Sequence, residues 1–282
     1  MNHAIRIHTF CRFNYPYNSI EMEKILKESY FLSAGDTNAE HELALTVLTS
    51  KLIDIATLHA NSLEIGNPCM EAMHAGWILS RLTIEMYRYP EVNSNYEVST
   101  WIEEFNRHYS TRCFKIASKN GEALGYARSI WMVMDTENHT NLGLSHFNLD
   151  PNLVSGEKAP IDLQAKHLPI VLPNVESNEH KKFLTADYLP VTCNFQYCDL
   201  DSYRHVNTVK YVTLLLNQFS LQQHDEYKIK RLELSFLNEA KYGMNCELLR
   251  ADNQNHEISS FYLQEENSKK GLMFARVFRS LR

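Results

Sequence analysis

Long apolar runs are missing from this chain of 282 residues. The most apolar candidates, such as residues 211–216, fall far short of the roughly 18 residues that span a bilayer. Residues 1–21 also lack the continuous apolar core of a secretory signal. Six cysteines form no C-x-x-C pair and no regular framework, so we expect reduced thiols in a cytoplasmic protein. The formal net charge of −6 argues against nucleic acid as the main partner.

Several motifs of enzyme chemistry are absent from the sequence as well. It contains no G-x-S-x-G nucleophile elbow, no phosphate loop and no G-x-G-x-x-G dinucleotide motif. His41 and Glu42 do not begin an H-E-x-x-H motif, and the other histidines lack metal-ligand spacing. The sequence therefore predicts neither a cofactor nor a metal site.

The composition is that of a globular protein, with 44% hydrophobic and 22% charged residues, and the length is enough for two domains. Residues 1–20 differ from the rest, because they contain Arg6 and Arg12 but no acidic residue. We expect residues 1–26 to be an N-terminal extension, with the native chain starting at Met22.

Two pairs of similar segments indicate an internal duplication. Residues 80–86 and 230–236 share an arginine at a spacing of 150, and residues 125–128 and 273–276 share one at a spacing of 148. Two matches at nearly one spacing predict that the chain contains the same structural unit twice.

Both halves have the same order of predicted elements: an extended segment, one long apolar helix and four strands. The extended segments are residues 30–34 and 189–197, and the helices are residues 43–63 and 206–219. The strands are residues 77–89, 97–105, 112–117 and 124–134, then 229–237, 245–250, 257–264 and 272–278.

Short connections between the strands predict antiparallel pairing, since parallel neighbours need long crossovers. An antiparallel sheet curved around a buried helix is a hotdog fold. We therefore predict an α+β tandem (double) hotdog, with an N-terminal hotdog in residues 27–143 and a C-terminal one in residues 188–282. Four prolines and little periodicity mark residues 144–187 as a linker strap.

The segment from Asp199 to Asn207 carries the most chemistry. Asp201 and His205 lie four residues apart, directly before a predicted apolar helix that Asn207 is suited to cap. The N-terminus of a helix presents free amides that can stabilise an oxyanion. The segment is thus either an acid–histidine site with an oxyanion pocket or merely a capped helix with a surface histidine.

The order of these residues resembles the acyl-acyl-carrier-protein (acyl-ACP) thioesterase family. Residues 199–211 are similar to its signature D-L-D-x-N-x-H-V-N-N-V-K-Y, and residues 76–81 to the bacterial segment G-W-V-L-S-R. The match extends from about residue 27 to the C-terminus. The resemblance implies a double-hotdog hydrolase that releases free fatty acid from the carrier protein in fatty-acid synthesis.

The resemblance also implies site residues. Asp201, His205 and Glu239 match the catalytic acid, histidine and glutamate of the family. Tyr203 stands where the family has asparagine, and Ala240 where some members have cysteine, which excludes a Cys–His nucleophile there. Tyr203 and Asn207 are possible auxiliary residues.

These residues suggest hydrolysis by water. We expect Glu239 to act as general base, His205 to orient the water, and Asp201 to hold one ring nitrogen of His205. Backbone amides near residues 205–207 would bind the oxyanion. We expect the first half to be non-catalytic and to form the acyl-chain pocket, because Asp36 and His41 are five residues apart and Tyr89 takes the place of Glu239.

The expected partner is an acyl carrier protein with its phosphopantetheine-linked acyl chain. Because such carriers are acidic, we expect docking through Arg204, Lys210 and Arg231. No membrane partner is expected, and the chain is expected to be a monomer or a homodimer. Two alternatives stay open: an acyl-CoA thioesterase, and a non-catalytic acyl-thioester binding protein, the latter because of Tyr203.

Overall fold

The computed structural model of the chain describes residues 23–138, 140–147, 149–162, 170–171, 184–185 and 188–282. The expected extension at residues 1–26 thus lies almost wholly outside the described residues. The chain divides into two compact units. The first contains everything up to Ser80 together with Arg88–Asp162, and the second contains Arg81–Tyr87 together with everything from Leu163 onward.

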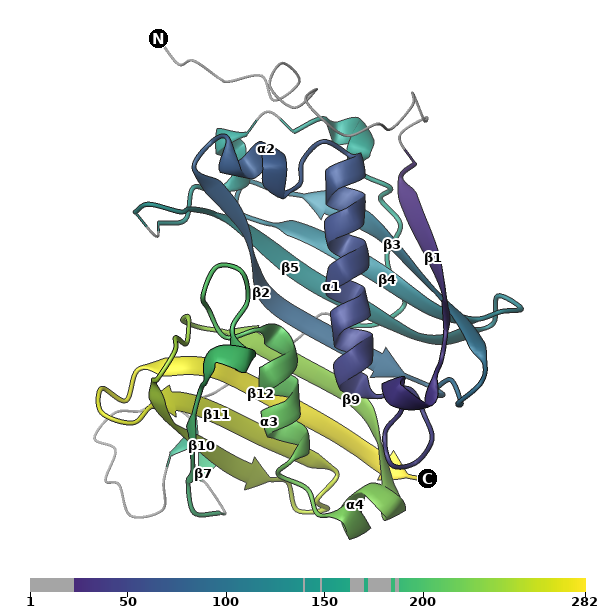
Figure 1. The fold of residues 1–282 in the computed structure, drawn as a ribbon, viewed down its shortest axis with the longest axis vertical. Coiled ribbons are helices and arrows are strands. Elements are labelled where there is room, and N and C mark those ends of the chain that lie inside the picture. Colours follow the sequence, from purple (N-terminus) through teal and green to yellow (C-terminus); the bar gives the residue numbers. More distant parts are fainter. Residues whose placement is uncertain (1–22, 139, 148, 163–169, 172–183, 186–187) are drawn as a thin grey trace. The chain divides into compact units, whose positions relative to one another are not determined.

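The first unit is an antiparallel sheet packed against one long helix, α1 (Figure 1). Its strand order is β1-β3-β4-β5, with β2 next to β5. Its strands and α-helices are β1 (Ile25–Phe31), α1 (Leu45–Ser62), α2 (Asn67–Glu71), β2 (Ala75–Met86), β3 (Asn95–Phe105), β4 (Ser110–Ser118) and β5 (Ala123–Asp135). Three 3₁₀ helices complete it: η2 (Ala34–Asp36), η3 (Leu144–His146) and η4 (Pro151–Leu153).

The second unit repeats this plan with α3 on its sheet. The strand order is β9-β12-β11-β10-β8, and the second half of β2 pairs with β9. Its elements are β8 (Val191–Asn194), the 3₁₀ helix η5 (Tyr197–Asp199), α3 (Thr208–Leu216), α4 (Leu221–Glu226), β9 (Tyr227–Phe236), β10 (Asn245–Asp252), β11 (Ile258–Glu265) and β12 (Gly271–Leu281). A separate parallel pair joins β6 (Ile170–Val171) to β7 (Leu184–Thr185).

The predicted tandem hotdog is confirmed. Every predicted strand and both long helices are present, with ends that differ from the prediction by a few residues. Sequence reasoning missed the short helices α2 and α4, because five or six residues are too few to show a helical period. No helix among the described residues is long and apolar enough to span a membrane.

Burial explains why α1 and α3 are so apolar. Leu48, Leu52 and Ile55 of α1 are at most 1% exposed, and Val212 and Leu215 of α3 are fully buried. Each side chain of this kind stabilises the fold by about 1.5–3 kcal/mol relative to an exposed position. The helix therefore sits on the sheet face that the alternating strand residues make apolar.

The duplicated segments pair with each other. Arg81 lies opposite Ser235, and Glu85 opposite Arg231, in an antiparallel register of β2 with β9. Arg231 binds Glu85 at 2.6 Å and Glu233 at 2.8 Å. The sequence repeat thus marks two equivalent strands, β2 and β9. Because they pair, residues 81–87 belong to the second unit, an assignment that the sequence did not predict.

The first part of the predicted strap, up to residue 162, belongs to the first unit. The Trp101 indole donates to the Glu157 carbonyl at 2.7 Å, and Arg128 donates to the Ile161 carbonyl at 3.2 Å. Ala159 and Ile161 pack on Trp101. This segment covers the sheet face that carries the buried Arg128–Glu103 ion pair, whose N–O distance is 2.7 Å.

The cysteines depart from the expectation at one position. Four of them, Cys113, Cys193, Cys198 and Cys246, are free thiols. Cys69 on α2 is disulfide-bonded, so the expectation of a fully reduced set is wrong for this residue.

A buried histidine links α1 to β4 in the first unit. His59 is fully buried, its Nε2 bonds the Glu23 carbonyl at 3.0 Å, and its Nδ1 meets Arg112 Nη1 at 2.8 Å. The carbonyl can only accept and the guanidinium can only donate, so the ring is neutral with its proton on Nε2. Burial, and then the charge of Arg112, lower the pKa of His59 to about 4.

This histidine predicts an acid-sensitive first unit. The unfolded chain binds a proton at the ordinary pKa of 6.5, whereas the folded chain does so only near 4, so stability is lost as pH falls between these values. We expect the free energy of unfolding to drop by about 3 kcal/mol over this range from His59 alone. Denaturant unfolding of the wild type and of His59→Gln at pH 7 and pH 4.5 measures this drop, which should be smaller in the variant.

The same unfolding series with His108→Gln, which replaces an exposed histidine, serves as the control and should keep the wild-type pH slope. A wild-type slope that survives in His59→Gln would contradict the assignment of this acid sensitivity to His59.

Candidate active site

Two loops of the second unit meet to form the site. One runs from β8 to α3 and the other from β9 to β10. The Val206 amide donates to the Ala240 carbonyl at 3.0 Å, and His205 forms an isolated bridge with Lys241. These backbone contacts bring His205 beside Glu239, although 34 positions separate them in the sequence.

The imidazole of His205 and the carboxylate of Glu239 form the central contact. His205 Nε2 lies 3.0 Å from Glu239 Oε2, and the side chains are 25% and 27% exposed. At this distance the ring nitrogen can donate to the carboxylate, which only accepts when it is ionised. This contact leaves His205 Nδ1 and Glu239 Oε1 without a partner among the described residues, and both can reach a water molecule.

Asp201 differs from its expected role. Its Oδ1 accepts the amides of Tyr203 at 2.9 Å and His205 at 3.0 Å, and the ring partner of His205 is Glu239 instead. The expectation that Asp201 holds a ring nitrogen of His205 is therefore wrong. A carboxylate two and four residues before these amides closes the turn locally, which positions His205 through its backbone.

Asn207 caps α3 as expected, with its side-chain oxygen accepting the Val209 amide at 2.9 Å. The predicted oxyanion donors at residues 205–207 are already used. The His205 amide donates to Asp201, the Val206 amide to Ala240 and the Asn207 amide to Asp199. The first amide without an acceptor among the described residues is that of Thr208, at the start of α3.

Tyr211 is a supporting residue that sequence reasoning did not assign. It is 3% exposed and lies against the rings of Phe195 and Phe236. Burial raises its pKa well above the usual range, so it stays a neutral phenol. Its place one turn into α3 beneath the site could have suggested this role, since such a position faces the core.

Tyr203, the main departure from the family signature, is 42% exposed. Its neighbour Arg204 has a φ of 63°, a left-handed conformation that closes the turn between Asp201 and His205. This left-handed residue and the hydrogen bonds to Asp201 fix the backbone of the turn before His205.

The predicted docking cations fall into two groups. Arg231 is paired with Glu85 and Glu233, and its side chain is 13% exposed, so its prediction as a docking residue is wrong. Arg204 is exposed, and Lys210 lies 3.5 Å from Asp199 with 36% of its side chain exposed. Lys241, which the sequence did not suggest, is exposed directly opposite His205.

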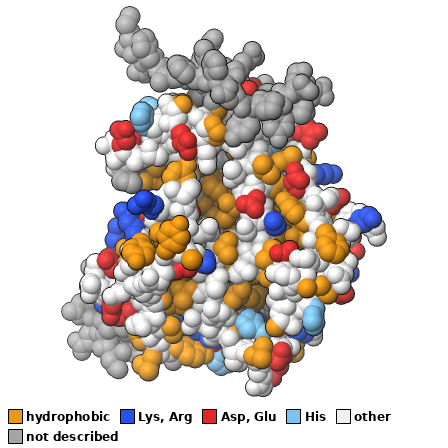
Figure 2. Space-filling view, viewed as in Figure 1, with side chains coloured by type: hydrophobic (Ala, Val, Ile, Leu, Met, Phe, Trp, Pro, Cys, Tyr) orange, Lys and Arg blue, Asp and Glu red, His pale blue; other side chains and the backbone are white. Residues whose placement is uncertain are grey.

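Acidic and basic side chains are interspersed on the face that Figure 2 shows. Arg204 and Lys241 are the cations of the two loops that form the site, Lys210 lies in the first turn of α3, and we call these three the loop cations.

The first unit contains the same loop with other side chains. The Leu43 amide donates to the Pro90 carbonyl at 2.9 Å, and the Glu42 amide donates to Asn38 Oδ1 at 2.8 Å. The equivalents of Asp201, His205 and Glu239 are therefore Asn38, Glu42 and Tyr89. The suggested echo at Asp36 and His41 is displaced, since their equivalents are Asp199 and Arg204.

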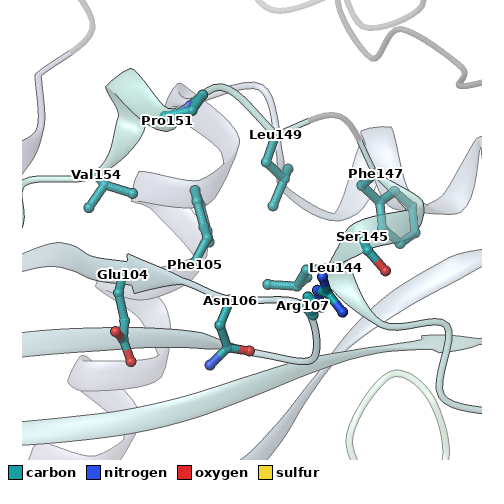
Figure 3. A pocket seen from close by; sticks show the side chains of 10 residues that line it. All are labelled: Glu104, Phe105, Asn106, Arg107, Leu144, Ser145, Phe147, Leu149, Pro151 and Val154. Carbon is teal, nitrogen blue, oxygen red and sulfur yellow. The ribbon is translucent and has the colours of Figure 1, made fainter.

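The first unit also holds an apolar cavity of about 580 Å³ (Figure 3). Phe105 points into it from β3, and Leu149, Pro151 and Val154 face it from the segment after β5. Its other lining residues are Glu104, Asn106, Arg107, Leu144, Ser145 and Phe147.

The turn formed by Asp201 predicts different outcomes for two substitutions. Asp201→Ala leaves the Tyr203 and His205 amides without their acceptor, so we expect a loss of about 1–3 kcal/mol in unfolding free energy. Asp201→Asn keeps an acceptor oxygen and should stay within about 0.5 kcal/mol of the wild type. Denaturant unfolding measures both free energies, with Asp225→Ala at an exposed position of α4 as the control. Equal losses of stability in the two Asp201 variants would contradict the role of Asp201 as the acceptor that closes the turn.

Comparisons with known proteins agree with this geometry. Residues 23–142 match the acyl-ACP thioesterase N-terminal domain, and residues 185–277 match the C-terminal domain. A chloroplastic palmitoyl-acyl carrier protein thioesterase of Arabidopsis thaliana is 22% identical over 222 residues, which are 76% of this chain and 52% of that protein. A chloroplastic oleoyl-acyl carrier protein thioesterase of the same plant is 22% identical over 76% of this chain and 60% of its own length.

The chain thus spans little more than half the length of these curated relatives. Solved structures are similar over more of their length. An acyl-ACP thioesterase from Bacteroides thetaiotaomicron has a TM-score of 0.76 at 22% identity, covering 93% of this chain and all of that one. The 12:0-ACP thioesterase from Umbellularia californica has a TM-score of 0.73 at 16% identity, with 94% and 100% covered.

These two structures show the same fold. The two domain matches cover most of the chain in the order that the signature residues predict. The chain therefore belongs to the acyl-ACP thioesterase family.

Proposed function

We propose that this protein is a thioester hydrolase that releases free fatty acid from acyl-acyl-carrier protein in fatty-acid biosynthesis. The observation that carries the proposal is the 3.0 Å contact between His205 Nε2 and Glu239 Oε2 at the N-terminus of α3. Family membership supplies the class of reaction, and the paired acid and imidazole supply the groups that activate water.

In the proposed mechanism Glu239 takes a proton from a water molecule through its Oε1 atom. The hydroxyl adds to the thioester carbonyl carbon, and the carbonyl oxygen becomes an oxyanion near the free Thr208 amide. Collapse of this intermediate breaks the C–S bond, and the proton is delivered to the leaving thiolate. His205 holds Glu239 in place and orients the water, while Asp201 and Asn207 position His205 and α3.

The proposed substrate carrier is an acidic acyl carrier protein that docks on the loop cations. Arg204 and Lys241 adjoin His205 in the sequence and in the loop pairing, so a phosphopantetheine arm bound beside them would reach the site. We further propose a cytoplasmic location, with the catalytic groups confined to the C-terminal hotdog and residues 27–143 providing the acyl-chain pocket.

The first unit suits the role of acyl-chain pocket. Its equivalents of the catalytic residues, Asn38 and Tyr89, supply neither the acid nor the glutamate. Six of the ten residues lining its cavity are apolar, which suits a site for a hydrocarbon chain.

The proposal predicts which side chains turnover requires. Glu239→Gln removes the base and His205→Gln weakens its support, so we expect kcat to fall at least about 100-fold in each, with the fold unchanged. Fatty-acid release from C8 to C18 acyl-carrier proteins measures this, with circular dichroism to check folding. Glu257→Gln, at an exposed glutamate of the same unit, is the matched control and should be fully active.

Other outcomes separate the alternatives. Equal turnover of acyl-CoA and acyl-carrier substrates would favour an acyl-CoA thioesterase. A wild type that binds acyl carriers without releasing acid, and gains release as Tyr203→Asn, would favour the non-catalytic binding protein. Undiminished release by Glu239→Gln would refute the assigned base.

The cavity predicts an effect on chain length. Leu149→Trp fills space in the cavity, so we expect kcat/KM to fall about tenfold for the longest accepted chains while shorter chains are retained. The same acyl-carrier panel measures this, with Leu221→Trp, at an exposed leucine of α4, as the control. An unchanged chain-length profile in Leu149→Trp would place the acyl chain elsewhere.

A further inference from the structure

The helix-facing side of the first sheet carries an unexpected group of polar side chains. It consists of His59 on α1, Thr100 on β3, Arg112 on β4, and Ser129 and Trp131 on β5, which we call the polar strip. Arg112 lies directly opposite Ile102 and Ser129 in the sheet register, so these side chains share one face. A pocket for a plain hydrocarbon chain needs no such group.

Arg112 is the centre of the polar strip. It is 5% exposed, and its Nη1 donates to His59 Nδ1 at 2.8 Å and to Thr100 Oγ1 at 3.2 Å. Among the described residues it has no carboxylate partner, and its other guanidinium nitrogens have no acceptor. Arg128 differs in this respect, since it is paired with Glu103, and so does the buried Arg250, which is paired with Asp252. The buried Arg279 of the second unit donates to the His256 carbonyl and to Ser259, so these acceptors are also neutral.

The neighbours of Arg112 do not neutralise its charge. His59 is a neutral acceptor, and Glu103 points to the opposite sheet face, where it binds Arg128 and Cys113. Burial lowers the pKa of Arg112 only to about 10, so it remains a cation at neutral pH. A buried cation without an anionic partner costs several kcal/mol, and an oxygen brought in by a ligand would recover part of that cost.

The polar strip shares a wall with the cavity. Ile102, the strand partner of Arg112, belongs to an apolar cluster with Leu153 and Leu63. Phe105, Leu149 and Val154 pack on the same cluster and also line the cavity. The strand partner of Arg112 therefore belongs to the apolar cluster on which cavity-lining side chains pack.

From this arrangement we propose that Arg112 is a specificity-determining residue that hydrogen-bonds an oxygen on the acyl chain, so that the preferred substrates are acyl thioesters with a hydroxyl or carboxylate away from the thioester. This inference rests on the proposed function, because it assumes that the acyl chain occupies the first unit. The oxygen of either a hydroxyl or a carboxylate on the acyl chain supplies the acceptor that Arg112 lacks, and a carboxylate also supplies the missing negative charge.

The test compares three acyl-carrier thioesters of one chain length: plain, ω-hydroxy and ω-carboxy. For the wild type we expect kcat/KM to be at least about tenfold higher for an oxygenated chain than for the plain one, the value of about 1.4 kcal/mol. The ω-hydroxy and ω-carboxy substrates separate hydrogen bonding from charge pairing. In Arg112→Met the preference should vanish, and in Arg112→Lys it should survive in part for the carboxylate.

Arg88→Met is the matched control, because Arg88 is an exposed arginine of the first unit that is not among the residues lining the cavity. Its preference should equal that of the wild type; loss of preference there, with Arg112→Met unaffected, would overturn the assignment. A wild type that prefers the plain chain, or shows no preference, overturns the inference even if Arg112→Met does not fold. A wild type that releases no acid from any substrate refutes the proposed function itself.

Discussion

The candidate site depends on one backbone hydrogen bond, from the Val206 amide to the Ala240 carbonyl. It ties the loop before α3 to the loop after β9, and both catalytic candidates sit one residue away from it. With this contact in place, His205 Nε2 and Glu239 Oε2 meet at 3.0 Å. Tyr211, one turn into α3, is buried against Phe195 and Phe236, so the helix that follows His205 is anchored in the core of the second unit.

The equivalent loop hydrogen bonds in the first unit show that the backbone arrangement can be kept while the reactive side chains change. The Leu43 amide donates to the Pro90 carbonyl, and Asn38 closes its turn as Asp201 does in the second unit. The backbone is thus duplicated, but the acid, the imidazole and the base are replaced. Duplication of a hotdog conserves hydrogen bonds that shape the loop, because the sheet and helix require them, whereas the reactive side chains are needed only once.

The buried arginines differ in whether a carboxylate matches their charge. In the second unit Arg231 and Arg276 are matched by Glu85 and Glu233, so their ion pairs hold strands together. In the first unit Arg128 is matched by Glu103 on the covered face, but Arg112 on the helix side has only neutral neighbours. An unmatched buried charge lowers stability, and such departures from good packing are typical of sites that receive a ligand.

The sequence by itself determined the hotdog plan and the duplication, because period and turn residues are local properties of the chain. The family resemblance named His205 and Glu239 as candidate site residues, and only the folded chain paired them with each other. Only the tertiary structure decided the role of Asp201, the loss of the amides at residues 205–207 as oxyanion donors and the burial of Arg231. Each of these depends on which partner a polar group meets after the chain has folded. Sequence spacing cannot specify that choice, since the competing acceptors come from strands and loops far away along the chain.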